Sequence, residues 1–262
     1  MLVFLALLSL SHLLSGNVVL RHAEFWIYPA QTILCGALLL WFRSCYEFHS
    51  PQNLVFTLLI GFGVFVIWIA PQQFFNFPPR TVGFDPSLLS SNSANYWLSV
   101  VFRFLRLAVV VPVMEEIFWR AFLLRFLLDE QFERVPFGKF SWLSFGVVTV
   151  AFTFSHSRPD WLAAFVCGAL YNIVAYRTRS LGSCILGHAL TNLLLGLWIM
   201  QTRQWGFLVT VAAVYDRNKG LNERVSLLFL WHFACSYEPD ARHLFPESHH
   251  LCRCRPRCCR LN

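Results

Sequence analysis

The sequence predicts an all-α fold, a polytopic transmembrane bundle of about seven to eight helices. Hydrophobic residues make up 56% of the 262 residues and charged residues 13%, whereas a soluble domain carries about 25% charged residues. Apolar runs long enough to cross a bilayer recur along the chain, separated by polar segments. Together these observations place the chain in a membrane and exclude an ordinary soluble domain.

The individual spans follow from these runs. Residues 1–20 are taken as a first span, because they lack the basic start and the small-residue cleavage site of a signal peptide. The run 96–128 is too long for one straight span, and Pro112 is expected to kink it. An eighth span remains open, since residues 208–214 and 225–233 are short. The remaining spans are expected at 26–42, 53–70, 140–156, 161–176 and 181–200.

Three regions are predicted along the chain. Residues 1–95 form an N-terminal transmembrane anchoring region that ends in a loop rich in Pro and Ser. Residues 96–206 form a membrane core that carries the intramembrane polar side chains. Residues 207–262 form a Cys/Arg-rich tail, which we expect to be disordered and whose cysteines show no CxxC pairs at zinc-site spacing.

The net charge of +7 indicates a lipid partner. A basic excess on a hydrophobic chain is typical of loops that face anionic lipid and the cytoplasm. The chain shows no basic-aromatic module or duplex-reading motif. We therefore expect the lipid bilayer as a partner and no nucleic acid.

Two adjacent acids stand inside the run 96–128. Glu116 and Arg120 are about one helical turn apart and share a face, so an ion pair between them is expected. Glu115 is rotated by roughly 100° from its neighbour. A structural ion pair between helices would explain Glu116 and Arg120. It leaves the Glu115 carboxylate without a structural role, which favours a chemical one.

Further polar residues occur in two later spans. His156 closes the fifth span, and His188 and Asn192 lie four residues apart in the seventh, so they share a helix face. A lone intramembrane histidine is more often a packing residue. Intramembrane ionisable groups normally face the bundle interior, so the acids, histidines and Asn192 are expected to converge there.

Such a set of side chains can hydrolyse a peptide bond without a covalent nucleophile. Glu115 with His156 can hold and deprotonate a water, while His188 and Asn192 donate hydrogen bonds to the oxyanion. No cofactor is needed in this version, which we favour. The alternative uses Glu115, His156 and His188 as ligands of zinc. A serine nucleophile is disfavoured because the chain has no G-x-S-x-G.

The three motifs resemble those of the CAAX prenyl endopeptidase family, the glutamic-type intramembrane proteases and their bacterial immunity-type relatives. They occur in the family's order and at its internal spacing: Glu115-Glu116-x-x-x-Arg120, Phe152-x-x-x-His156 and His188-x-x-x-Asn192. The resemblance covers roughly residues 96–206, and the run from Leu170 to His188 is similar to a bacterial subgroup associated with exosortase systems.

The resemblance implies an intramembrane endopeptidase. Glu115 and His156 would activate water, His188 and Asn192 would form the oxyanion site, and Glu116 and Arg120 would support them. We expect a membrane-embedded or membrane-anchored peptide as the partner, from a lipidated or sorting-signal protein, and a bacterial cell (inner) membrane as the location; the resemblance itself does not carry the substrate. A non-catalytic immunity or binding protein with the same fold is a further alternative.

Overall fold

The computed structural model describes residues 24–77, 85–89 and 92–208. In these ranges every regular element is a helix and none is a strand, so the all-α prediction is confirmed there. The six predicted runs between residues 26 and 200 are all helical. The expected span 1–20 lies outside the described residues, and so do the open eighth span and the tail beyond residue 208. The principal α-helices are α2 (Glu24–Trp41), α3 (Leu54–Phe74), α4 (Ser93–Leu105), α5 (Val111–Glu116), α6 (Leu124–Phe126), α7 (Trp142–Phe154), α8 (Trp161–Thr178) and α9 (Leu181–Thr202).

Three helical stretches among the described residues are long and apolar enough to cross a membrane: Leu54–Phe74, Ser93–Phe126 and Leu181–Thr202. Two shorter apolar helices, Ile27–Trp41 and Trp142–Phe154, accompany them. This pattern agrees with a membrane protein. The predicted number of seven to eight spans is not confirmed, because the remaining helices are shorter or less apolar.

The long run through the two acids is helical throughout, but its hydrogen-bond ladder changes twice. Two π-helical segments, η4 (Arg106–Val110) and η5 (Ile117–Leu123), lie on either side of α5. Pro112 lies at the start of α5, immediately after η4. Because proline lacks the N–H of a regular ladder, the expected distortion before the acids takes the form of a π segment.

The loop expected from residue 71 begins later than predicted. α3 continues through Pro71, which is buried in the last turn, and ends at Phe74. A proline near a helix end forfeits a single backbone hydrogen bond, so the helix can extend past it. A short 3₁₀ segment, η3 (Pro86–Leu89), follows before α4.

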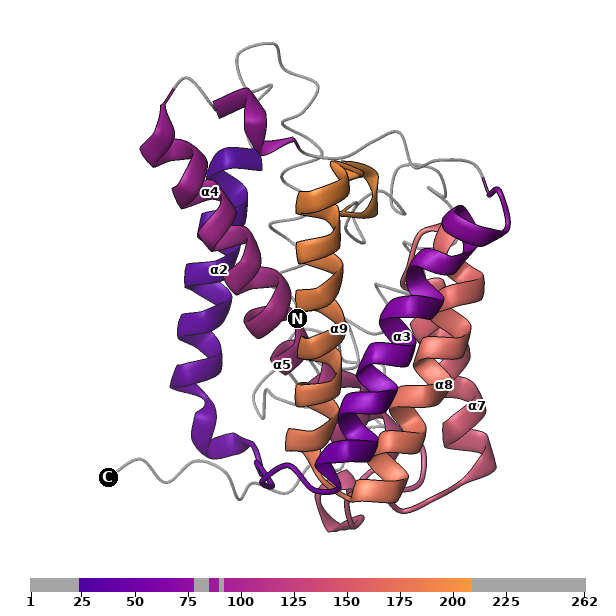
Figure 1. Cartoon of the computed structure of the whole chain (residues 1–262). Helices are drawn as coiled ribbons and strands as arrows, with labels where there is room; N and C mark the ends of the chain where they lie inside the picture. The colour runs from indigo at the N-terminus through magenta and orange to yellow at the C-terminus, as the bar shows by residue number, and fades with distance from the viewer. Residues whose placement is uncertain (1–23, 78–84, 90–91, 209–262) are drawn as a thin grey trace, which may run out of the picture. The chain divides into compact units, whose positions relative to one another are not determined.

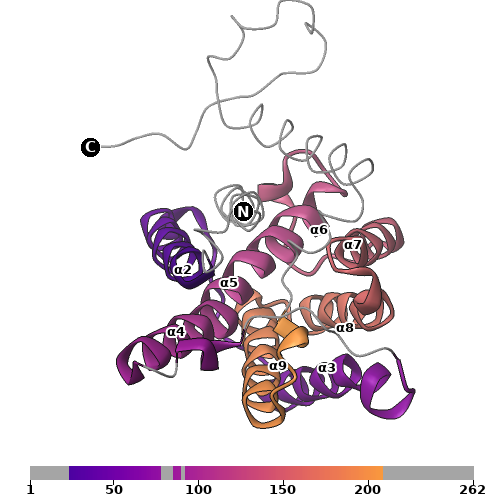
Figure 2. The same cartoon turned by 90° about the horizontal axis from the view of Figure 1, so that it is seen from above.

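Helix α9 lies among the other helices of the described region. It contacts α3, α8, η4 and α5 (Figure 1). The helical stretch Ser93–Phe126, which runs from α4 through α6, is called the α4–α6 rod. Seen from above, it has α2 on one side and α9 and α3 on the other (Figure 2). α3 and α9 cross closely at Gly61, where an added Cβ would lie 2.6 Å from the carbonyl oxygen of Gly187. Gly187 precedes His188, so this crossing fixes the depth at which His188 enters the bundle.

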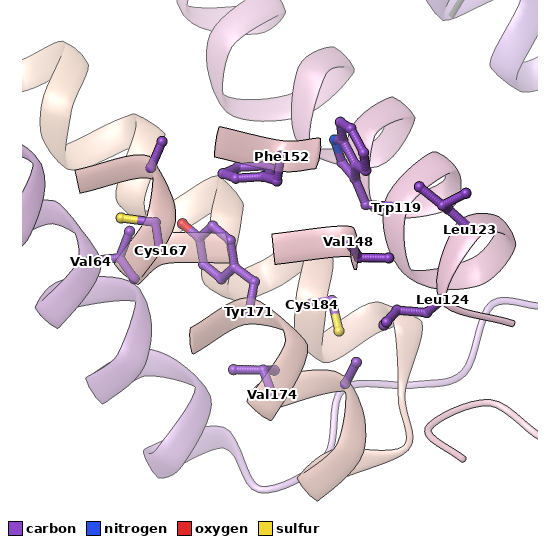
Figure 3. Packing of buried hydrophobic residues seen from close by; sticks show 12 residues of the cluster. Val64, Trp119, Leu123, Leu124, Val148, Phe152, Cys167, Tyr171, Val174 and Cys184 are labelled. Atoms are coloured by element: carbon purple, nitrogen blue, oxygen red, sulfur yellow. The ribbon is translucent and has the colours of Figure 1, made fainter. Parts of the chain in front are cut away.

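A hydrophobic cluster packs α3, α7, α8, α9 and the end of the α4–α6 rod together. Tyr171 lies near its centre, while Trp119 and Phe152 meet at one side with ring centroids 5.7 Å apart (Figure 3). These aromatic residues surround the polar side chains of the motifs. The motif residues are therefore held by a close-packed apolar environment rather than by loops.

Candidate active site

The ion pair predicted between Glu116 and Arg120 is present. Nη1 of Arg120 lies 3.0 Å from Oε1 of Glu116, and both side chains are fully buried. Nη2 of Arg120 donates to the carbonyl oxygen of Gly168 on α8 at 3.4 Å. Its guanidinium lies over the rings of Phe152 and Tyr171, at 5.1 and 5.3 Å from their centroids. A buried cation with these partners is compensated, so the spacing argument is confirmed.

The same carboxylate joins the first motif to the third. Nδ1 of His188 lies 2.8 Å from Oε1 of Glu116, although the two residues are 72 positions apart in sequence. Because a carboxylate accepts, Nδ1 of His188 carries the hydrogen in this bond. The other ring nitrogen, Nε2, forms no hydrogen bond within the described residues. Glu116 thus fixes both the orientation and the tautomer of His188.

A second set of contacts holds the other side of the His188 ring. Tyr171 stacks on it, with centroids 5.1 Å apart and an angle of 22° between the planes. The Tyr171 hydroxyl donates to Oγ1 of Thr191 at 2.8 Å, and Thr191 donates to the carbonyl oxygen of Gly61 at 2.7 Å. Our sequence analysis did not single out Tyr171 or Thr191. A tyrosine directly after Gly, Ala and Leu on an apolar helix was the available signal.

His156 is held locally at the end of α7. Its Nδ1 lies 2.8 Å from the carbonyl oxygen of Phe152, one turn earlier. Since a carbonyl can only accept, Nδ1 carries the hydrogen and neutral His156 has a free lone pair on Nε2. The half-buried ring makes an edge contact with Trp68, at 5.3 Å between centroids. This arrangement is suited to a general base.

Asn192 lies one turn after His188 on α9, as the spacing predicted. Its Nδ2 donates to the carbonyl oxygen of Leu107, in segment η4, at 2.9 Å. The side chain is half-buried. Asn192 therefore links the third motif to the helix that carries the acids. The contact point on that helix, Leu107, lies five residues before Pro112.

Glu115 differs from its neighbour in both burial and contacts. Its side chain is half-buried, and within the described part of the chain its carboxylate forms no hydrogen bond or ion pair. The structure brings Glu116, Arg120 and His188 into direct contact. It does not join Glu115, His156 and Asn192 to them by a direct bond, and their roles stay predictions.

The ligand set of the zinc alternative is not assembled. Among the described residues, no group of three or more His, Cys, Asp or Glu side chains is arranged to hold a metal ion. Glu115, His156 and His188 as they stand therefore do not fit a zinc ion.

The geometry defines a helical membrane protein with an acid, an arginine and a histidine buried together between distant segments. Residues 97–194 match the family of Rce1-like type II CAAX prenyl endopeptidases. The resemblance predicted from the three motifs is confirmed for this part of the chain, which is similar to the Rce1-like domain of a protease family.

One relative extends this similarity beyond the matched domain. The chain is 23% identical over 202 residues to the UPF0177 protein YaiH of Lactococcus lactis, an alignment that covers 72% of this chain and 76% of the relative. No solved structure matches the chain significantly.

Proposed function

We propose that the chain is an intramembrane endopeptidase that hydrolyses a peptide bond of a membrane-associated protein with an activated water. One observation carries the proposal. His188 is locked by the buried Glu116, whereas the Glu115 carboxylate and Nε2 of His156 have no partner among the described residues. Groups that are committed to the fold and groups that remain reactive therefore occur side by side.

In the proposed reaction, Glu115 and Nε2 of His156 hold a water and take its proton as the oxygen attacks the scissile carbonyl carbon. The same proton then passes to the leaving amine. The oxyanion of the tetrahedral intermediate accepts hydrogen bonds from Nε2–H of His188 and from the amide of Asn192. Donation from Nε2 requires His188 to be an imidazolium, because its Nδ1–H is already directed at Glu116.

The substrate class is suggested by the family to which residues 97–194 are similar. We propose a lipidated or sorting-signal peptide anchored in the same membrane as the enzyme. The relative in Lactococcus lactis supports a bacterial cell membrane as the location. The apolar stretches Leu54–Phe74, Ser93–Phe126 and Leu181–Thr202 support a multi-pass chain.

The test is cleavage by the purified protein in proteoliposomes. The substrate is a quenched fluorescent peptide ending in farnesyl-Cys-aliphatic-aliphatic-X, compared with the same peptide without the farnesyl group. We expect cleavage of the farnesylated peptide by the wild type and at least about a hundredfold loss in Glu115→Ala. Normal cleavage by Glu115→Ala would rule out the mechanism, and cleavage of neither peptide would rule out a prenylated Cys-aliphatic-aliphatic-X substrate.

The two alternatives give different outcomes in the same assay. Loss of cleavage on treatment with a chelator, restored by zinc, would favour the metalloprotease. Tight binding of the peptide with no cleavage in any lipid composition would favour a non-catalytic binding or immunity protein. We expect a chelator to leave the rate unchanged.

A further inference from the structure

A backbone carbonyl without a regular helical partner, that of Leu107, lies about two turns before the two acids. In an α-helix the carbonyl of Leu107 would accept the N–H of residue 111, and in a π-helix that of residue 112. The N–H of Val111 is directed instead to the carbonyl of Arg106. Residue 112 is a proline and has no N–H. Neither of the two helical donors reaches Leu107.

Asn192 supplies the missing donor from another helix. Its Nδ2 lies 2.9 Å from the Leu107 carbonyl oxygen. In a helix that crosses a membrane, an unpaired carbonyl is costly, so this bond is strongly favoured. The side-chain amide is planar and Nδ2 carries two hydrogens. Directing one at Leu107 therefore fixes the direction of the other.

We propose that Pro112 is a positioning residue for Asn192, acting through the Leu107 carbonyl. By lacking an N–H, Pro112 keeps that carbonyl free to accept from Asn192. The second Nδ2–H is then held in the direction in which it serves the oxyanion. This inference rests on the proposed function, in which Asn192 is an oxyanion donor.

Any other residue at position 112 would restore an N–H within the helix that carries Leu107. That donor is tethered to the same backbone as its acceptor, whereas Asn192 reaches it from α9. The local donor would therefore compete with Asn192 and release its amide. The bond between Asn192 and Leu107 also explains how the distortion at Pro112 affects Asn192, 80 positions later in sequence.

The first test is a double-mutant cycle on cleavage of the farnesylated peptide. For Asn192→Ala we expect kcat to fall about a hundredfold, as for the loss of an oxyanion donor. For Pro112→Ala we expect kcat to fall roughly tenfold with KM unchanged, because the amide is misdirected rather than removed. The double variant should be no slower than Asn192→Ala alone. Pro29→Ala, in the interior of α2, is the control and should keep the wild-type rate.

The second test separates the N–H from the shape of the side chain. Lactic acid introduced at position 112 by nonsense suppression has the methyl group of alanine but an ester oxygen in place of the N–H. We expect this ester protein to cleave at close to the wild-type rate, whereas Pro112→Ala is slow. A helix-straightening effect would slow both proteins alike.

The outcomes distinguish this inference from the proposed function. If Asn192→Ala cleaves normally, the oxyanion role is wrong and the proposed mechanism loses this residue. If Asn192→Ala is slow but Pro112→Ala keeps the wild-type kcat, the positioning role alone is overturned. A double variant much slower than Asn192→Ala, or an ester protein as slow as Pro112→Ala, would overturn it as well.

Discussion

Two polar regions of the bundle treat their ionisable groups in opposite ways. Between α5 and α9, Glu116, Arg120 and His188 are buried and bonded to one another. His156, just after α7, and Glu115, on α5, are half-buried, and neither bonds to another charged group within the described residues. The first region is a buried ion-pair network, and the second consists of the groups to which the proposed function assigns the chemistry.

The difference shows how adjacent glutamates in one helix acquire separate roles. A rotation of about 100° along the helix turns one carboxylate into the core and the other towards a less enclosed surface. The buried acid is then needed for stability, because removing it strands a cation. The half-buried acid is free for chemistry. Variants that separate stability from cleavage test this division.

The largest expected effect on stability is that of Glu116→Ala. It leaves the buried Arg120 guanidinium without its carboxylate, which costs about 3–5 kcal/mol in the free energy of unfolding. Denaturation of the protein in mixed micelles measures this value. Glu115→Ala is the matched control, and for this half-buried side chain we expect a change within about 0.5 kcal/mol. Equal losses in the two variants would remove the distinction between the regions.

His156→Ala should affect the reaction rather than the fold. Loss of a general base lowers the rate about 10²–10⁴-fold, while loss of the half-buried ring against Trp68 has a small effect on stability. Cleavage of the farnesylated peptide and thermal unfolding are measured on the same sample. His49→Ala, an exposed histidine outside the motifs, should cleave at the wild-type rate. An unfolded His156→Ala protein would instead assign His156 to the structural region.

Gly61→Ala should destabilise the contact between α3 and α9 beside His188. The added Cβ would meet the carbonyl of Gly187 at 2.6 Å, so the crossing helices must separate. Such overpacking costs about 1–3 kcal/mol in the free energy of unfolding. Gly63→Ala, two residues later, meets no atom within 4 Å and should be neutral. If both alanine variants unfold alike, the close crossing beside His188 is not required.

Tyr171→Phe should have the smallest effect. The ring still stacks on His188, but the hydrogen bond from the Tyr171 hydroxyl to Thr191 is lost, at about 1 kcal/mol. Tyr176→Phe is a suitable comparison, because the Tyr176 hydroxyl makes only a long contact of 3.5 Å with Ser144. We expect Tyr176→Phe to change stability less than Tyr171→Phe. The reverse order would show that the Tyr171 hydroxyl does not help to hold His188.

Spacing within one helix could be read from the sequence, and contacts between helices could not. The Glu116–Arg120 pair follows from a separation of four residues in a helical segment. The bond from His188 to Glu116 spans 72 positions and depends on the depth at which α9 crosses α3, which Gly61 and Gly187 set. Sequence alone therefore assigned support to Glu116 without identifying the histidine that it holds.

The two π segments on either side of α5 could not be predicted from the sequence pattern either. Pro112 indicated a distortion, but whether the ladder tightens, breaks or widens depends on the neighbouring donors. The Leu107 carbonyl can accept from Asn192 because the hydrogen-bond ladder widens into a π segment at this point. The contacts that orient the candidate site thus arise where one helix compensates for a defect in another.

The most direct measurement compares Glu115→Gln and Glu116→Gln in cleavage of the farnesylated peptide, with both proteins shown to be folded. Both substitutions keep the shape of the side chain and remove its charge. We expect Glu115→Gln to lose at least about a hundredfold in kcat, because the water is no longer deprotonated. Glu116→Gln should retain measurable cleavage, reduced by roughly tenfold through His188. Wild-type cleavage by Glu115→Gln, or a greater loss in Glu116→Gln, would contradict the assignment of the two acids.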